Sequence, residues 1–152
     1  MKLSRVYSNQ HKQFPIIQFN GVTDDRLSIV FAKITRPKDR KKDSHNLGKT
    51  TLIHLIDFLL LKSITEGNHF LGKHSDRFSP FTFFLELQTP KGSYVTVRRS
   101  VAAPTKICIK QHDERGIDGT SIGQAKWDHN DIPIDKAKDI LDAYLNLTVI
   151  KP

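Results

Sequence analysis

An unusually apolar run at residues 51–61 follows directly on a Gly-Lys-Thr tripeptide at residues 48–50. The run is long enough for a helix, and its two polar interior residues, His54 and Asp57, lie three positions apart. Residues at that spacing share one narrow stripe of a helix, so the remaining helix surface is apolar nearly all round. We therefore expect a helix that is buried inside the protein, with other elements packed around it.

The tripeptide matches the last three positions of the triphosphate-binding (Walker A) pattern G-x-x-x-x-G-K-[S/T]. Asp43 stands at the first glycine position, which weakens the match. Asn46 offsets this in part, because asparagine tolerates the left-handed backbone conformation that a glycine would supply. The pattern also lies between an expected buried strand, residues 27–34, and the apolar helix. The alternative interpretation is an ordinary turn before a core helix, since Gly-Lys-Thr often occurs by chance.

The phosphate-loop interpretation predicts a site for ATP and Mg²⁺. In such loops backbone N–H groups surround the phosphates, the lysine neutralises the terminal oxygens and the hydroxyl ligates magnesium. Lys49 and Thr50 would take the last two roles, and Thr51 would place a second hydroxyl near the phosphates. The complete set of predicted nucleotide-binding residues is Ser44, His45, Asn46, Leu47, Gly48, Lys49, Thr50 and Thr51.

The rest of the chain predicts an α/β fold. Six segments have the apolar patterns of strands, namely residues 2–7, 15–19, 27–34, 81–88, 94–101 and 106–110. The last three are separated by turn residues and predict an antiparallel meander. A polar excursion follows at residues 111–131, where packing is the simplest role for Trp127. A final helix is expected from Pro133, capped by Asp131, with its apolar residues on one face.

Composition limits the number of domains and the cellular compartment. With 152 residues, of which 38% are hydrophobic, the chain fits a single domain at residues 1–152 and not two. Its one cysteine, Cys108, excludes an intramolecular disulfide and a zinc site built on paired thiolates. The longest apolar run contains His54 and Asp57, and the amino terminus lacks the apolar stretch of a signal peptide. We expect a cytoplasmic protein that does not contact membranes.

A basic segment precedes the phosphate-binding pattern. Residues 33–42 hold six basic residues against one acidic residue, Asp39. Clustered Lys and Arg side chains favour nucleic-acid backbones, so five residues are candidate contacts: Arg36, Lys38, Arg40, Lys41 and Lys42. We favour the other interpretation, a solvated loop insertion at residues 36–44, because no interleaved aromatic residue offers a stacking platform for bases.

The order of these features resembles the amino-terminal part of ABC-type ATPase heads of the SMC, RecN and RecF class. Those heads also begin with Met-Lys-Leu and two short strands, and they carry phrases like those at residues 83–86 and 94–99. Residues 42–51 and 55–60 are most similar to a bacterial RecN/SMC-like family with a domain of unknown function near its carboxyl end. In that family Asp-Ser-His-Asn replaces the glycine-rich start, so the resemblance implies that Asp43 is a family trait.

The resemblance implies a P-loop NTPase fold, with a mixed sheet around a buried phosphate-loop helix and the meander at the periphery. It also implies a carboxyl-terminal ATPase lobe as partner, homodimerisation of heads, possible DNA contact, and a role in DNA repair or defence against foreign DNA. No glutamine loop, signature motif or Asp-Glu strand is recognisable, and Glu86 is expected to be a solvated strand residue. We therefore expect an ATPase fragment that binds ATP with little hydrolysis. The alternative is a small basic nucleic-acid-binding β-rich module without nucleotide binding.

Overall fold

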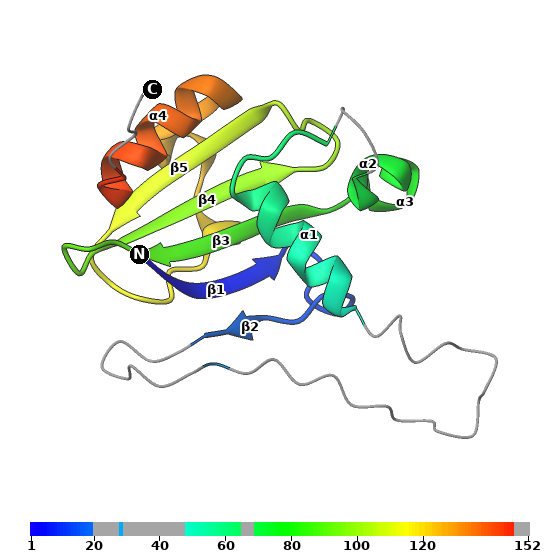
Figure 1. Cartoon of the computed structure of the whole chain (residues 1–152), viewed down its shortest axis with the longest axis horizontal. Coiled ribbons are helices and arrows are strands. Elements are labelled where there is room, and N and C mark those ends of the chain that lie inside the picture. The colour runs from blue at the N-terminus through cyan, green and yellow to red at the C-terminus, as the bar shows by residue number, and fades with distance from the viewer. Residues whose placement is uncertain (20–27, 29–47, 65–68, 148–152) are drawn as a thin grey trace.

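The computed structural model describes residues 1–19, 28, 48–64 and 69–147 of the chain. These residues form a mixed α/β structure in which one six-stranded antiparallel sheet carries a few helices (Figure 1). In chain order the helices and strands are β1 (Lys2–Ser8), β2 (Ile17–Gln18), α1 (Lys49–Leu59), α2 (Phe70–Lys73), α3 (Ser75–Phe78), β3 (Thr82–Gln88), β4 (Tyr94–Ser100), β5 (Lys106–His112), β6 (His129–Pro133) and α4 (Ile134–Leu145).

The strand order in the sheet is β2-β1-β3-β4-β5-β6, and every pair is antiparallel. Strands β3, β4 and β5 follow one another along the chain, which confirms the predicted antiparallel meander. The meander is not peripheral, because α1 packs directly on β3 and β4, and the described sheet is antiparallel and not mixed. Strand β1 joins β3 from the amino terminus, with Val6 opposite Leu85. Strand β6 extends the sheet beyond β5 and begins inside the segment that the sequence indicates to be a polar excursion.

One face of the sheet carries the main hydrophobic core. Alternation along β3 directs Phe83, Leu85 and Leu87 to this face, where α1 packs on β3 and β4 and α4 packs on β5 and β6 (Figure 1). Leu85 and Leu87 are completely inaccessible to solvent. Both helices therefore lie on the same side of the sheet and share one core.

The opposite face is covered by the long connection between β5 and β6. A second, smaller cluster there consists of Tyr7, Phe84, Cys108 and Trp127. The rings of Tyr7 and Phe84 stack with their centroids 4.9 Å apart, and the Phe84 and Trp127 rings lie 6.5 Å apart. Trp127, the single tryptophan, is only 5% exposed, which confirms the predicted packing role.

Helix α4 has the predicted apolar face but not the predicted cap. Ala137, Leu141 and Leu145 are buried at helical spacing. Pro133 immediately precedes the helix, and no side chain caps it. Asp131 instead lies in β6 with a φ of 48°. Because β6 continues to Pro133, the helix begins too late for Asp131 to reach its first turn.

The second strand is shorter than the sequence pattern predicts, whereas β1 extends one residue beyond the predicted strand at residues 2–7. The strand predicted at residues 15–19 is reduced to the two residues of β2. Pro15 has no N–H group to donate to a neighbouring strand, which limits the pairing at this end. The strand predicted at residues 27–34 lies outside the described residues, apart from Ser28, which is not in a strand.

Candidate functional site

The start of α1 has the local geometry of an anion-binding helix terminus. Gly48 stands immediately before the helix with a φ of 80°, a left-handed conformation that glycine adopts without steric penalty. No side chain caps the helix, and its first turn contains no acidic residue. The first N–H groups of a helix lack partners within the helix and carry partial positive charge. Together with the exposed side chains of Lys49 and Thr50, this turn favours a bound anion.

Helix α1 is covered on one side only by the described residues. Leu55, Phe58 and Leu59 are buried against the sheet. Ile53 is 61% exposed and Leu60 is 38% exposed. The prediction of a helix buried on nearly all sides is therefore wrong for the described residues, because the sheet and α2 together cover only part of the surface of α1.

A hollow of about 260 Å³ lies beside the first turns of α1. Thr51 and Leu55 contribute to its wall from the helix. The other lining residues come from the loop after β1, from α2 and α3, and from the start of β3 and the residue before it, and they are Gln13, Phe14, Leu71, Arg77, Phe78, Phe81 and Phe83. The hollow thus combines aromatic and aliphatic walls with an amide, a hydroxyl and a guanidinium.

Ring contacts hold the aromatic wall of the hollow in place. The rings of Phe14 and Phe83 meet edge to face with centroids 5.7 Å apart. Phe81 packs on Phe83 at 5.4 Å and on Phe78 at 5.5 Å. Aromatic pairs at such separations are stabilising beyond the area that they bury. The wall is therefore held in place by the mutual packing of its own rings.

The carboxyl end of α1 is fixed by Arg99 of β4. Arg99 is 1% exposed, and its guanidinium donates to the carbonyl oxygens of Phe58, Lys62 at 2.8 Å and Pro104 at 2.7 Å. Its central carbon also lies 4.1 Å from the centroid of the Phe58 ring. Burial lowers the pKa of Arg99 to about 10, which leaves the side chain charged at neutral pH.

His69 provides a second polar contact to α1. Its Nδ1 accepts a hydrogen bond from the Leu71 N–H at 3.3 Å, so Nε2 carries the proton in the neutral ring. Nε2 then donates to the carbonyl oxygen of His54 at 3.1 Å. Burial lowers the pKa of His69, which favours this neutral form.

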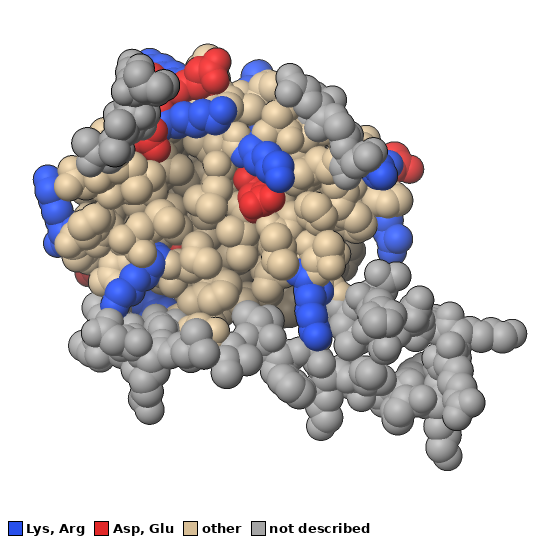
Figure 2. All heavy atoms as spheres, viewed as in Figure 1, with Lys and Arg blue, Asp and Glu red and all other residues tan. Residues whose placement is uncertain are grey.

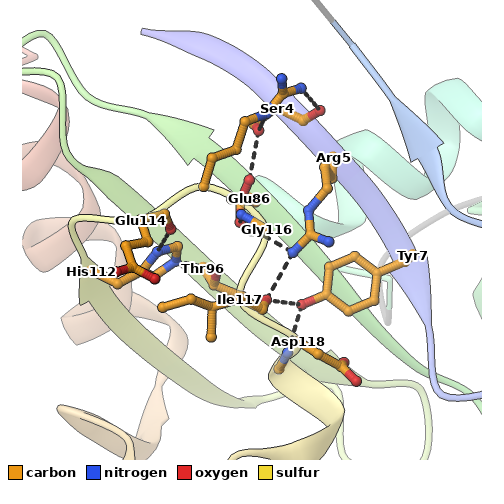
Figure 3. A network of polar contacts seen from close by, with 12 residues as sticks. Ser4, Arg5, Tyr7, Glu86, Thr96, His112, Glu114, Gly116, Ile117 and Asp118 are labelled. Atoms are coloured by element: carbon orange, nitrogen blue, oxygen red, sulfur yellow. Dashed lines mark hydrogen bonds and ion pairs between the residues drawn. The ribbon is translucent and has the colours of Figure 1, made fainter. Parts of the chain in front are cut away.

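Glu86 is completely buried on the face of the sheet opposite α1, so the prediction of a solvated residue is wrong (Figure 3). Its carboxylate accepts hydrogen bonds from the Ser4 hydroxyl at 2.6 Å, from Arg5 at 3.1 Å and from the Gly116 N–H at 2.9 Å. A buried carboxylate requires such partners, because removing it from water is costly. Glu86 therefore anchors the β5–β6 connection and lies too far round the sheet to act on a ligand at α1.

Two further side chains extend this network. Arg115 donates to the Ser4 hydroxyl at 2.9 Å and to the Phe19 carbonyl oxygen at 2.6 Å. The Tyr7 hydroxyl accepts from the Gly119 N–H at 2.9 Å and lies 3.3 Å from the Ile117 carbonyl oxygen (Figure 3). Burial is the main reason that the pKa of Tyr7 rises to about 12. The sequence carries no local signal for this network, since its members are up to 112 residues apart.

The described residues include only part of the predicted site. Gly48, Lys49, Thr50 and Thr51 lie together at the start of α1. The other predicted nucleotide-binding residues, Ser44, His45, Asn46 and Leu47, lie outside the described residues. So does the predicted insertion at residues 36–44, with the candidate nucleic-acid contacts Arg36, Lys38, Arg40, Lys41 and Lys42. The hollow beside Thr51 is not apparent from the sequence, because its walls come from separate segments.

Lys and Arg side chains are scattered over the face shown in Figure 2 and do not gather into one patch. Among the described residues, no group of three His, Cys, Asp or Glu side chains is placed to hold a metal ion. Within the same ranges no helix is both long and apolar enough to cross a membrane.

No protein-family model matches the chain, and no curated protein or solved structure is significantly similar to it.

Proposed function

We propose that this chain is the ATP-binding lobe of an SMC/RecN-like ATPase, with a P-loop NTPase fold of the ABC type. The observation that carries the proposal is the start of α1, where left-handed Gly48 precedes an uncapped first turn with exposed Lys49 and Thr50. Phosphate binding requires free N–H groups, a nearby cation and the absence of competing carboxylates. The first turn of α1 contains the cation, Lys49, and has no acidic residue.

The described residues suggest which groups would hold Mg²⁺-ATP. Lys49 would neutralise the terminal phosphate oxygens, and the Thr50 hydroxyl would be one oxygen ligand of the magnesium ion. Bound magnesium would offset phosphate charge. Residues 44–47 would complete the loop with backbone N–H groups, as the sequence pattern predicts.

The hollow beside α1 supports a nucleoside triphosphate over a free phosphate. Thr51 belongs both to the first turn and to the wall of the hollow, so the two sites adjoin. The volume of about 260 Å³ is below the usual range for sites that enclose a drug-sized ligand, about 300–1,000 Å³, and suits one flat ring system. Phe14 and Phe78 would give such a ring an aromatic wall, and Gln13 and Arg77 would supply hydrogen-bonding groups.

The proposal assigns little hydrolysis to this chain alone. Glu86 is held by Arg5 and Ser4 on the opposite face of the sheet, and Asp57 is bonded to Lys62 at 2.9 Å near the other end of α1. Efficient phosphoryl transfer requires a group that orients the attacking water beside the phosphate. We propose that a second, carboxyl-terminal lobe supplies it.

The outer surface of α1 agrees with such a partner lobe. Ile53 on α1 and Leu60, the residue immediately after the helix, are seven residues apart and both exposed. A covering lobe would bury these side chains. The proposal also includes pairing of heads in the intact protein, a cytoplasmic setting, and a role in DNA repair or defence against foreign DNA. These last points rest on the sequence resemblance.

A fluorescent-ATP titration with magnesium tests nucleotide binding. We expect saturable binding by the wild-type chain and at least about tenfold weaker binding by Lys49→Ala, because a charged hydrogen-bond donor to the phosphates is lost. Lys91→Ala is the matched control, since Lys91 is an exposed lysine in the β3–β4 turn. Its affinity should equal that of the wild type.

The alternative function, a small basic nucleic-acid-binding module, predicts the opposite pattern. The net charge of +8 favours it. In that case the folded wild type would show no ATP binding but would bind DNA with an affinity that falls steeply as salt increases. This result would overturn the proposal of an ATP-binding lobe.

A further inference from the structure

Arg99 is a buried cation without an anionic partner among the described residues. It belongs to β4 and is 1% exposed, yet its contacts with described residues are with carbonyl oxygens and an aromatic ring. A buried charge is costly unless its surroundings compensate it. The compensation here comes from backbone oxygens, and two of the three belong to the end of α1 and the residues just after it.

The position of these oxygens explains why a cation is tolerated. Phe58 lies in the last turn of α1, and Lys62 follows the helix. Carbonyl groups at the carboxyl end of a helix lack partners within it and carry partial negative charge. Arg99 thus supplies the cation that this end of α1 requires, and the ring of Phe58 offers a face to the same guanidinium.

Apolar packing alone would not fix α1 along its axis. Leu55, Phe58 and Leu59 hold the helix on the sheet, but hydrophobic attraction is non-directional. The three directed hydrogen bonds of Arg99 do define a position, because its planar guanidinium has donors in a fixed geometry. The carbonyl oxygen of Pro104 ties the same guanidinium to the segment after β4.

We infer that Arg99 is a positioning residue, which holds the carboxyl end of α1 on β4 so that the opposite end presents Gly48, Lys49 and Thr50 at a fixed place. The consequence for phosphate binding rests on the proposed function. The consequence for the position of α1 does not, and it can be measured without any ligand.

The test uses two substitutions in the complete chain and one control. Arg99→Met removes the charge and all three hydrogen bonds with little change in bulk. Arg99→Lys keeps the charge, but an ammonium group cannot reproduce the planar fork. Glu86→Gln is the control, because Glu86 is an equally buried charged residue that lies on the other face of the sheet.

Hydrogen exchange followed by mass spectrometry measures the position of α1 directly. In Arg99→Met we expect the amides of α1 to exchange at least about tenfold faster than in the wild type, while the amides of α4 change less. In Arg99→Lys the exchange rate of the α1 amides should lie between those of Arg99→Met and the wild type. Glu86→Gln should not affect α1 selectively. Equal protection of α1 in Arg99→Met and the wild type would overturn the inference. If Arg99→Met does not fold, the exchange rates of the α1 amides are compared between Arg99→Lys and Glu86→Gln. Faster exchange of α1 in Arg99→Lys supports the inference, and equal exchange overturns it.

Fluorescent-ATP titration of the same variants, well below their unfolding temperatures, adds the functional readout. Arg99→Met should bind about tenfold more weakly than the wild type, and Glu86→Gln should bind normally. A residue with a merely structural role would lower the unfolding temperature and leave the affinity of the folded protein unchanged. That result would overturn the positioning role. Absence of ATP binding by the wild type would instead refute the proposed function, and the exchange measurement would still decide the role of Arg99.

Discussion

Replacement of Glu86 by glutamine tests whether the buried ion pair anchors the β5–β6 connection. The side chain of Glu86 is completely buried and that of its partner Arg5 is 9% exposed, so neither charge is compensated by water. Removing one member of a buried pair typically costs about 3–5 kcal/mol. Glutamine keeps an oxygen for the Ser4 hydroxyl or the Gly116 N–H, so we expect a loss near the lower limit, about 3 kcal/mol.

Urea unfolding followed by the fluorescence of buried Trp127 measures this loss. With an m value of about 2 kcal/mol/M, the midpoint should fall by about 1.5 M and m should stay constant. The control is Lys110→Met, which breaks the more exposed pair between Lys110 and Asp128 and should change stability by about 0–1 kcal/mol. The double variant Arg5→Met/Glu86→Leu should recover much of the stability, because an apolar pair leaves no buried charge. Equal midpoint shifts for Glu86→Gln and Lys110→Met would refute the anchoring role.

Two further predictions concern the same face of the sheet. Gly119→Ala should lower stability in thermal unfolding by about 1–3 kcal/mol, because its Cβ would lie 2.7 Å from a ring carbon of Phe84 and 2.9 Å from the Tyr7 hydroxyl. Gly123→Ala, where the new Cβ meets nothing within 4 Å, should change stability by less than about 0.5 kcal/mol, and an equal effect of both would contradict the clash. Tyr7 has a pKa raised from 10.0 to about 12, so the unfolded chain releases this proton first and stability should fall as pH rises from 10 towards 12. The loss is at most about 3 kcal/mol, and urea midpoints at pH 9 and 11.5 should show a smaller decrease for Tyr7→Phe than for the wild type.

Local pattern was sufficient to predict the meander and the face of α4. Apolar residues alternate along β3, β4 and β5, and short turns force neighbouring strands to pair. The helical spacing of Ala137, Leu141 and Leu145 likewise needs no information from elsewhere in the chain. Strand β6 escaped prediction because only His129 and Ile132 of its five residues are even partly buried.

The environment of Glu86 depends on contacts that periodicity does not reveal. The sequence shows a carboxylate in an alternating strand, for which exposure is the ordinary expectation. Its partners Ser4 and Arg5 lie in β1, more than 80 residues earlier in the chain. An irregularity in the β1–β3 register between Leu3 and Arg5 accompanies this contact. Burial of Glu86 follows from strand pairing and could not be read from β3 alone.

The candidate site also has one part that the local sequence predicts and another part that depends on the fold. Gly48, Lys49 and Thr50 form a local motif, and the geometry at the start of α1 agrees with it. The hollow beside them needs Phe14 and Arg77, which only the fold brings to α1. The role inferred for Arg99 is also a consequence of tertiary structure, because its hydrogen-bond partners are 5 to 41 residues away in the chain.

The most direct test of the ATP-binding proposal is an amide-resolved NMR titration of the complete chain with magnesium and ATP. We expect saturable chemical-shift changes centred on the amides of Gly48, Lys49, Thr50 and Thr51. Smaller changes should appear around Phe14 and Arg77 when the base enters the hollow, and they should be absent when inorganic triphosphate replaces ATP. Unchanged amides at the start of α1, or changes confined to α4 and β6, would contradict the account.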